Sequence, residues 1–172
     1  MGMIKSILAA IAVLAVLAVA LFFIAGPVRV WSWFGPADLG PVVFERLERR
    51  LTPNDALVCP RDLCTAKSDL PAPSFAVDAR RLRAAMAEMI ASEPNVTRVD
   101  ADDAAQTERY IQRSARLGFP DTIVLRYIEQ PGARSTLAIY SRSQLGESDF
   151  GTNKARIERW LTKLRARVPA AP

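Results

Sequence analysis

The strongest hydrophobic pattern lies at the amino end of the chain. From Ile7 to Ala25, nineteen consecutive positions are uncharged and almost all are Ala, Val, Leu, Ile or Phe. At about 1.5 Å per residue a helix of this length spans about 28 Å, which matches the hydrocarbon thickness of a bilayer. Trp31 and Trp33 follow at the depth where aromatic rings favour the headgroup zone. The pattern therefore predicts a transmembrane anchor over 1–25, with the lipid bilayer as a partner.

A cleaved signal peptide is the main alternative for this segment. Lys5 supplies a positive amino-terminal region, and Ala18-Val19-Ala20 has the small-x-small form of a cleavage site. Against cleavage, the apolar run continues past that site and exceeds the usual length of the apolar region within a signal peptide. A buried core helix fits less well, because the run has no amphipathic period.

The charges that flank the anchor predict its orientation. Lys5 and the terminal amine lie on the amino side, whereas Arg29 is the only basic residue within the first twenty residues beyond the helix, 26–45. The positive-inside bias then places the amino end in the cytoplasm. We expect a single-pass protein of the inner (plasma) membrane with its carboxyl-terminal domain on the exported, periplasmic side.

Residues 26–51 are expected to form a connector that contains a short amphipathic helix. Pro41 suits a first helical position, and the apolar residues that follow it have an approximate helical spacing. Charged residues occupy the other face. Two interpretations stay open: this helix packs on its own domain, or it lies on the membrane surface.

Two later segments have a clear helical period. From Asp78 to Ser92 the apolar residues line one face, and Asp78 can cap the free N–H groups. From Thr152 to Val168 an apolar stripe recurs at helical spacing, and the opposite face is basic. The second stripe consists of Ile157, Trp160, Leu161, Leu164 and Val168. Both stripes are expected to be buried against one face of a sheet.

Runs rich in β-branched and aromatic residues lie between these two helices. The two clearest runs are separated by Gln130-Pro131-Gly132-Ala133, which suits a turn and predicts an antiparallel hairpin. The predicted strands are 96–100, 107–115, 121–128 and 135–141. We therefore expect an α+β domain over 52–168, in which an antiparallel sheet of three to four strands is flanked by two helices, and a tail over 169–172.

Composition narrows the chemistry. The chain of 172 residues contains no His, which excludes a Ser-His-Asp triad, a Cys-His dyad and His-ligated metal or haem. Its two cysteines cannot form a four-thiolate metal site within one chain. No metal and no cofactor are therefore expected. The net charge of +5 suits anionic lipid headgroups, and nucleic acid is not expected as a partner because no binding motif accompanies the charge.

Cys59 and Cys64 lie within residues 52–77, a Pro-rich stretch without a clear period. Their four intervening residues do not match the CxxC spacing of redox or zinc motifs. In an exported domain the simplest expectation is a disulfide that closes a short loop and staples this irregular stretch. A redox-active pair is the alternative.

The loop before the last predicted helix reads SRSQLGESDFGTNKARI over 141–157. It resembles the signature of the family known as domain of unknown function 1499, which runs approximately Ser-x-Ser-Arg-x-Gly-x-Ser-Asp-x-Gly-x-Asn-x-x-Arg. The steps Gly118 to Asp121 and Cys59 to Cys64 also resemble that family, and the likeness covers about residues 52–165. One position departs from the pattern, since Gln144 replaces a basic residue. The resemblance implies a fold and a site to inspect, not a reaction.

The same loop supplies the candidate site. Its glycines permit positive φ, and the helix that follows opens with free N–H groups beside basic residues, an arrangement that can hold an anion. The candidate anion- or ligand-binding residues are Arg142, Ser148, Asp149, Asn153 and Arg156. The alternative is structural: Asp149 caps the helix or pairs with an arginine and fixes a strand-to-helix corner.

These observations favour a membrane-anchored protein of the cell envelope whose α+β domain has a binding or structural role, with an anionic ligand or an envelope protein as its partner. The alternative hypothesis is an enzyme that acts on anionic envelope material through Arg142, Asp149 and Asn153. The sequence places no catalytic residue with a defined role.

Overall fold

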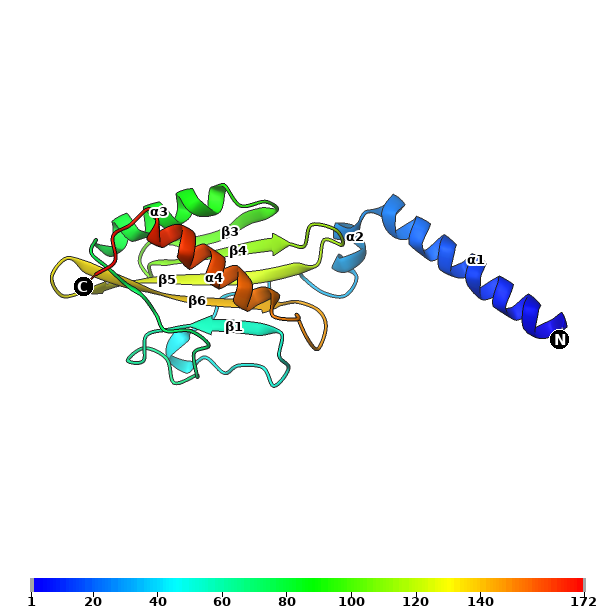
Figure 1. Ribbon diagram of the computed structural model, residues 1–172, viewed down its shortest axis with the longest axis horizontal. Helices are drawn as coiled ribbons and strands as arrows, with labels where there is room; N and C mark the ends of the chain where they lie inside the picture. Colours follow the sequence, from blue (N-terminus) through cyan, green and yellow to red (C-terminus); the bar gives the residue numbers. More distant parts are fainter. Residues whose placement is uncertain (1, 172) are drawn as a thin grey trace.

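The first helix, α1 (Gly2–Ala25), projects away from the rest of the molecule (Figure 1). The computed structural model describes residues 2–171. None of the 24 residues of α1 is buried, and its most apolar stretch of 18 residues has a mean hydropathy of 3.2. At 1.5 Å per residue the helix is about 36 Å long. The segment predicted as an anchor therefore forms a helix that is long and apolar enough to cross a membrane.

Gly26 ends α1 and starts the short helix α2 (Pro27–Ser32). The φ of Gly26 is +84°, a conformation that glycine adopts without steric cost, and Pro27 then occupies the first position of α2, where its missing N–H is not needed. Because of this break the chain changes direction at the end of the anchor, and α2 lies against the domain (Figure 1).

The domain is built on a six-stranded antiparallel sheet. Its strands are β1 (Asp55–Val58), β2 (Ser74–Phe75), β3 (Val96–Asp102), β4 (Thr107–Arg113), β5 (Pro120–Gln130) and β6 (Arg134–Ser143). The spatial order is β1-β6-β5-β4-β3, and β2 also pairs with β6. The predicted hairpin is confirmed as β5 and β6, in register from Asp121 opposite Ser143 to Gln130 opposite Arg134.

The expected α+β class is confirmed, but the strand number was too low. The two strands beyond the predicted three to four are β1 and β2, which both lie in the Pro-rich stretch 52–77. They are short, with four and two residues, so they carry little periodic signal. Both form because β6 is ten residues long: its free edge pairs with β2 near its start and with β1 near its end.

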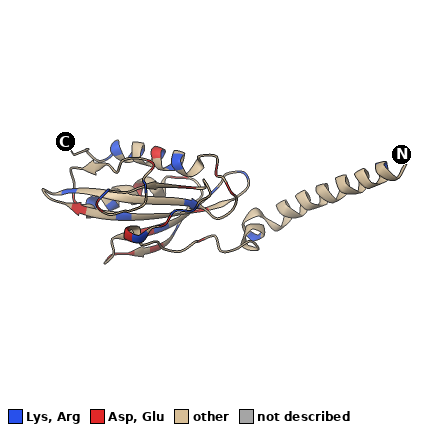
Figure 2. Ribbon diagram, turned by 90° about the horizontal axis from the view of Figure 1, so that it is seen from below, with Lys and Arg blue, Asp and Glu red and all other residues tan. Residues whose placement is uncertain are grey.

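Helices α3 (Ala79–Ala91) and α4 (Thr152–Arg165) cover one face of the sheet, as their stripes predicted. In Figure 2 the helical layer lies along one side of the strands. Asp78 caps α3 by accepting a hydrogen bond from the Arg81 N–H. Trp160 of α4 is fully buried at the centre of this layer. The core that it joins includes Leu82, Met86, Met89, Ile123, Leu125, Ile139, Ile157 and Leu161.

The connector covers the opposite face of the sheet. The helix expected near residues 41–51 is replaced by extended chain with one 3₁₀ turn, η1 (Phe44–Arg46). Phe44 and Leu47 are buried against the sheet, where they contact a second apolar cluster that includes Tyr140. An extended segment is favoured here because its backbone also bonds the sheet: the Leu39 N–H donates to the Thr122 hydroxyl. The apolar connector residues thus pack on their own domain.

One end of the sheet lies next to the anchor, and we call it the anchor-proximal end. It is formed by the loop 114–119 between β4 and β5, the loop 144–151 between β6 and α4, and the segment 51–54 that enters β1. Gln144 donates to the Pro36 carbonyl at this end. The β5–β6 turn lies at the other end of the molecule, away from α1 (Figure 1). Loop 144–151 is therefore held near the anchor.

Candidate functional site

The loop 144–151 leaves β6 at the anchor-proximal end and leads directly into α4. Gly146 and Gly151 have φ values of +87° and +79°, so the loop uses both glycines where the backbone turns into the left-handed region. Phe150 adopts a φ of +52°, which is uncommon for an aromatic residue. Phe150 and Gly151, both with positive φ, directly precede α4 and set the angle at which that helix starts.

Asp149 holds the start of α4. Its Oδ1 accepts from the Gly151 N–H at 2.9 Å, and its Oδ2 accepts from the Asn153 N–H at 2.9 Å. The Asn153 side chain adds a third bond to Oδ2 at 2.7 Å. A carboxylate at a helix amino end also faces the positive end of the helix dipole. Asp149 therefore occupies the N–H groups that an anion would need.

Asn153 is completely buried beneath this corner. Its Nδ2 donates to the Ser143 hydroxyl at 2.9 Å and to the Asn54 carbonyl at 3.2 Å, in addition to Asp149. Its Oδ1 accepts from the Ser141 hydroxyl at 2.6 Å. One amide side chain thus joins β6, α4 and the segment before β1, which explains why a buried polar residue is stable here.

Arg156, one turn further along α4, is 4% exposed and lies between the helix and the sheet. Its guanidinium donates to Asp121 on β5 and to Gln112 on β4. It also donates to the Ser141 hydroxyl at 2.8 Å and to the Asn153 Oδ1 at 2.6 Å. Because its donors are directed into the protein, Arg156 neutralises a buried carboxylate and is not exposed to a ligand.

Arg142 lies on the other face of the sheet. Side chains alternate along β6, so Ser141 and Ser143 face α4 while Arg142 faces the connector. There its Nη2 donates to the carbonyls of Leu39 and Gly40, both at 2.8 Å. Burial lowers the pKa of its guanidinium. Arg142 therefore holds the connector against the sheet.

Of the five candidate residues, the structure brings together Ser148, Asp149, Asn153 and Arg156 and separates Arg142 from them. The Ser148 hydroxyl accepts from the Phe150 N–H at 3.2 Å and is exposed. The arrangement matches the structural interpretation in which Asp149 caps the helix, with one difference: the buried arginine pairs with Asp121, not with Asp149. An anion site that combines all five residues is not assembled.

A hollow of about 280 Å³ opens beside this network. Phe119, Leu145 and Phe150 supply apolar surface, and Asp121, Ser143 and Asp149 lie on its polar side. Its lining contains no Lys or Arg. The hollow therefore suits an apolar group that carries a hydrogen-bond donor better than it suits an anion.

Sequence reasoning missed Asp121, Gln112 and Asn54, which complete the polar network. The signal for Asp121 was the Gly118-to-Asp121 step in the family resemblance. Asn54 is 2% exposed, and its Nδ2 donates to the Gly146 carbonyl at 2.6 Å. No local pattern distinguishes Gln112 or Asn54 from ordinary polar residues, because their partners are far away in sequence.

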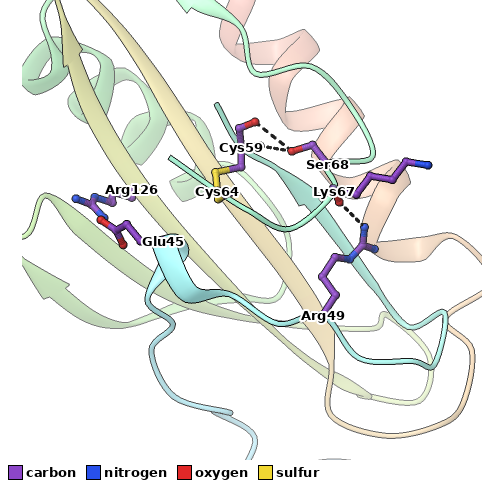
Figure 3. The surroundings of a disulfide bond; sticks show 7 residues. All are labelled: Glu45, Arg49, Cys59, Cys64, Lys67, Ser68 and Arg126. Carbon is purple, nitrogen blue, oxygen red and sulfur yellow. Dashed lines mark hydrogen bonds and ion pairs between the residues drawn. A yellow bond between two sulfur atoms is a disulfide. The ribbon is translucent and has the colours of Figure 1, made fainter. Parts of the chain in front are cut away.

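The structure joins Cys59 and Cys64 in a disulfide, with the Sγ atoms 1.95 Å apart (Figure 3). The Cys59 N–H donates to the Ser68 hydroxyl at 3.0 Å, and that hydroxyl donates to the Cys59 carbonyl at 3.1 Å. Arg49 of the connector donates to the Lys67 carbonyl at 3.0 Å in the same region (Figure 3). The disulfide therefore closes a loop that packs with the connector.

A second polar cluster supports the connector face. The Tyr140 hydroxyl donates to Asp55 Oδ2 at 2.6 Å, and Arg49 forms an ion pair with the same carboxylate. Burial raises the pKa of Tyr140, and the hydrogen bond to Asp55 raises it further. Tyr140 therefore stays protonated and serves as a hydrogen-bond donor.

The fold is an α+β domain: an antiparallel sheet with two helices on one face and an extended connector on the other, attached to an apolar helix. The sequence profile of the family described as protein of unknown function (DUF1499) matches residues 53–164, well over half of the chain. The chain belongs to this family. No curated protein sequence matches it significantly.

Proposed function

We propose that this protein is a single-pass protein of the inner membrane, with its amino end in the cytoplasm and its DUF1499 domain on the exported side. The observation that carries this proposal is α1, whose 24 residues include no buried side chain and whose most apolar stretch of 18 residues has a mean hydropathy of 3.2. A helix this apolar and this exposed is stable in a lipid environment, where it satisfies its own backbone groups.

We further infer a binding or structural role for the domain in the cell envelope. Support comes from the corner between β6 and α4: Asp149 of the loop 144–151 holds the start of the helix, and Asn153 and Arg156 of α4 are buried and bonded to other protein groups. An enzyme acting through Arg142, Asp149 and Asn153 is the less favoured candidate, because Arg142 faces the opposite side of the sheet. A partner would contact the exposed loop surface and the adjacent hollow.

Membrane fractionation of the full-length chain tests the anchor. We expect the protein to pellet with membranes and to resist carbonate extraction, with an intact amino terminus by mass spectrometry. The matched control is the double variant Leu14→Arg/Leu17→Arg, which places two charges at the centre of α1, each costing about 2.5–3.5 kcal/mol in a membrane. Recovery of the wild type as a soluble, shortened chain would overturn the proposal.

Two readouts test the orientation. Alkaline phosphatase fused to the carboxyl end should be active, since this reporter folds only after export. Cys59 and Cys64 should resist maleimide in intact cells until a reductant is added, because disulfides persist in oxidising compartments. Rapid alkylation of both thiols together with an inactive fusion would place the domain in the cytoplasm. If the domain is exported, crosslinking in intact cells identifies its partner in the envelope.

A further inference from the structure

Exposed apolar side chains outside α1 are concentrated at the anchor-proximal end. Among residues 26–171, nine large hydrophobic side chains are classed as exposed, and seven of them lie at this end or in the adjoining α2 segment. The seven are Val28, Trp33, Phe34, Leu51, Leu117, Phe119 and Phe150. Only Val43 and Val99 lie elsewhere. This one-sided distribution differs from the scattered single residues that are normal on a soluble surface.

Phe150 is the most informative of these side chains. It is 96% exposed, so the folded domain gains almost nothing from its ring. It also holds a φ of +52°, a backbone conformation that costs energy for a bulky residue. A strained, exposed aromatic residue at the tip of a loop indicates a contact outside the chain.

The position of this end relative to the anchor is fixed by aromatic contacts. Trp31 packs against Phe22 in the last turns of α1, with ring centroids 5.5 Å apart. It also stacks on Phe119, with centroids 4.3 Å apart, and its Nε1 donates to the Leu117 carbonyl at 2.6 Å. One tryptophan therefore links the end of the membrane-spanning segment to the β4–β5 loop, at the depth where aromatic rings meet headgroups.

Exposed cations lie at the same end as the apolar tips. Arg29, Arg116 and Lys154 are all exposed at this end, and Glu147 is the exposed acidic residue of loop 144–151. Apolar tips accompanied by basic side chains suit a surface with phosphate groups above hydrocarbon.

The geometry points to docking of the anchor-proximal end onto the lipid leaflet that surrounds α1, with Phe150, Leu117 and Leu51 inserted into its interface. This inference rests on the proposed membrane anchor and adds a second, peripheral contact. It orients the domain with its strand ends toward the bilayer, so that the hollow beside Phe150 opens at the headgroups.

Photocrosslinking of the full-length chain in liposomes of phosphatidylcholine and phosphatidylglycerol tests the docking. Benzoylphenylalanine replaces Phe150 in one variant and Ala133 in the matched control. Ala133 is exposed, also has a φ of +52°, and lies in the β5–β6 turn at the far end. A third variant carries the probe at Val16 in α1 and reports insertion of the anchor.

We expect lipid adducts at position 150 to exceed those at 133 by about tenfold, because burial of an aromatic ring in an apolar phase favours it by at least this factor. Equal labelling at 150 and 133, while Val16 is labelled, would overturn the docking alone. Adducts from 150 to a second copy of the chain in place of lipid would also overturn it. Absence of label at Val16 would overturn the anchor and the docking together.

Discussion

Trp31 stacks on Phe119, with ring centroids 4.3 Å apart and an angle of 26° between the planes. The two residues are separated by most of the domain's sequence, yet this contact joins the segment after the anchor to the loop between β4 and β5. It lies beside the hydrogen bond from Trp31 to the Leu117 carbonyl. The domain is therefore attached to α1 by packing as well as by the chain.

Trp31→Ala should loosen this attachment without unfolding the domain. An aromatic pair of this kind contributes about 0.5–1.5 kcal/mol. Its loss should therefore raise the population in which α2 is detached from the β4–β5 loop by about two- to tenfold. Limited trypsin digestion in detergent should show faster cleavage after Arg29 and Arg116. Trp33→Ala is the matched control, because Trp33 is 66% exposed. Identical cleavage rates in the two variants would contradict the role of Trp31.

Arg156→Met should destabilise the domain strongly. The substitution keeps a similar shape but leaves the Asp121 carboxylate buried without its cation, which costs about 3–5 kcal/mol. Urea unfolding of the full chain in detergent, followed by the fluorescence of buried Trp160, measures the loss. Adding Asp121→Asn should recover part of it. Arg165→Met, on the exposed side of the same helix, should change stability by less than about 0.5 kcal/mol; a comparable loss there would contradict the assignment.

Asp149→Ala should cost about 1–2 kcal/mol, because it removes the acceptor for two backbone N–H groups at the start of α4. Asp149→Asn should lose less, since its single side-chain oxygen can still accept one of these bonds. Thermal unfolding of the full chain measures both. Glu147→Ala in the same loop is the control and should behave like the wild type. If Asp149→Ala were neutral while abolishing ligand capture, a binding role for this carboxylate would replace the capping role.

Glu93 should give the domain a stability that disappears in acid. Burial alone would raise its pKa, but the Lys163 ammonium and the Arg159 guanidinium outweigh burial and hold the pKa below its ordinary value of 4.5. A lowered folded-state pKa stabilises the fold above the unfolded value and loses that effect as pH falls through the folded value.

The loss for Glu93→Gln should thus be about 1–2 kcal/mol at pH 7 and should shrink once pH falls below about 4.5. Urea unfolding from pH 7 to pH 3 measures the difference between the variant and the wild type. Glu88→Gln, on the exposed face of α3, should stay within about 0.5 kcal/mol at pH 7. A difference for Glu93→Gln that grows in acid would contradict the sign of the shift.

Local periodicity predicted the elements whose pattern is strong. The apolar run 7–25, the stripes of α3 and α4, and the β5–β6 hairpin all follow from spacing that one segment contains by itself. Strands β1 and β2 were missed because they are short and lie among prolines, so only the free edge of β6 defines them. The connector helix was expected wrongly, because burial of Phe44 and Leu47 on the sheet outweighed an approximate helical period.

The sequence by itself determined the apolar amino-terminal helix, the fold class and the loop that identifies the family, since these depend on hydropathy, period and a contiguous motif. Only the tertiary structure decided which loop residues meet. Arg142 and Arg156 look equally available in the sequence, but alternation along β6 sends one to the connector, and Asp121 binds the other inside the core. A buried charge pairs with a group that the fold brings within a few ångströms, and local sequence patterns do not predict which distant residue that will be.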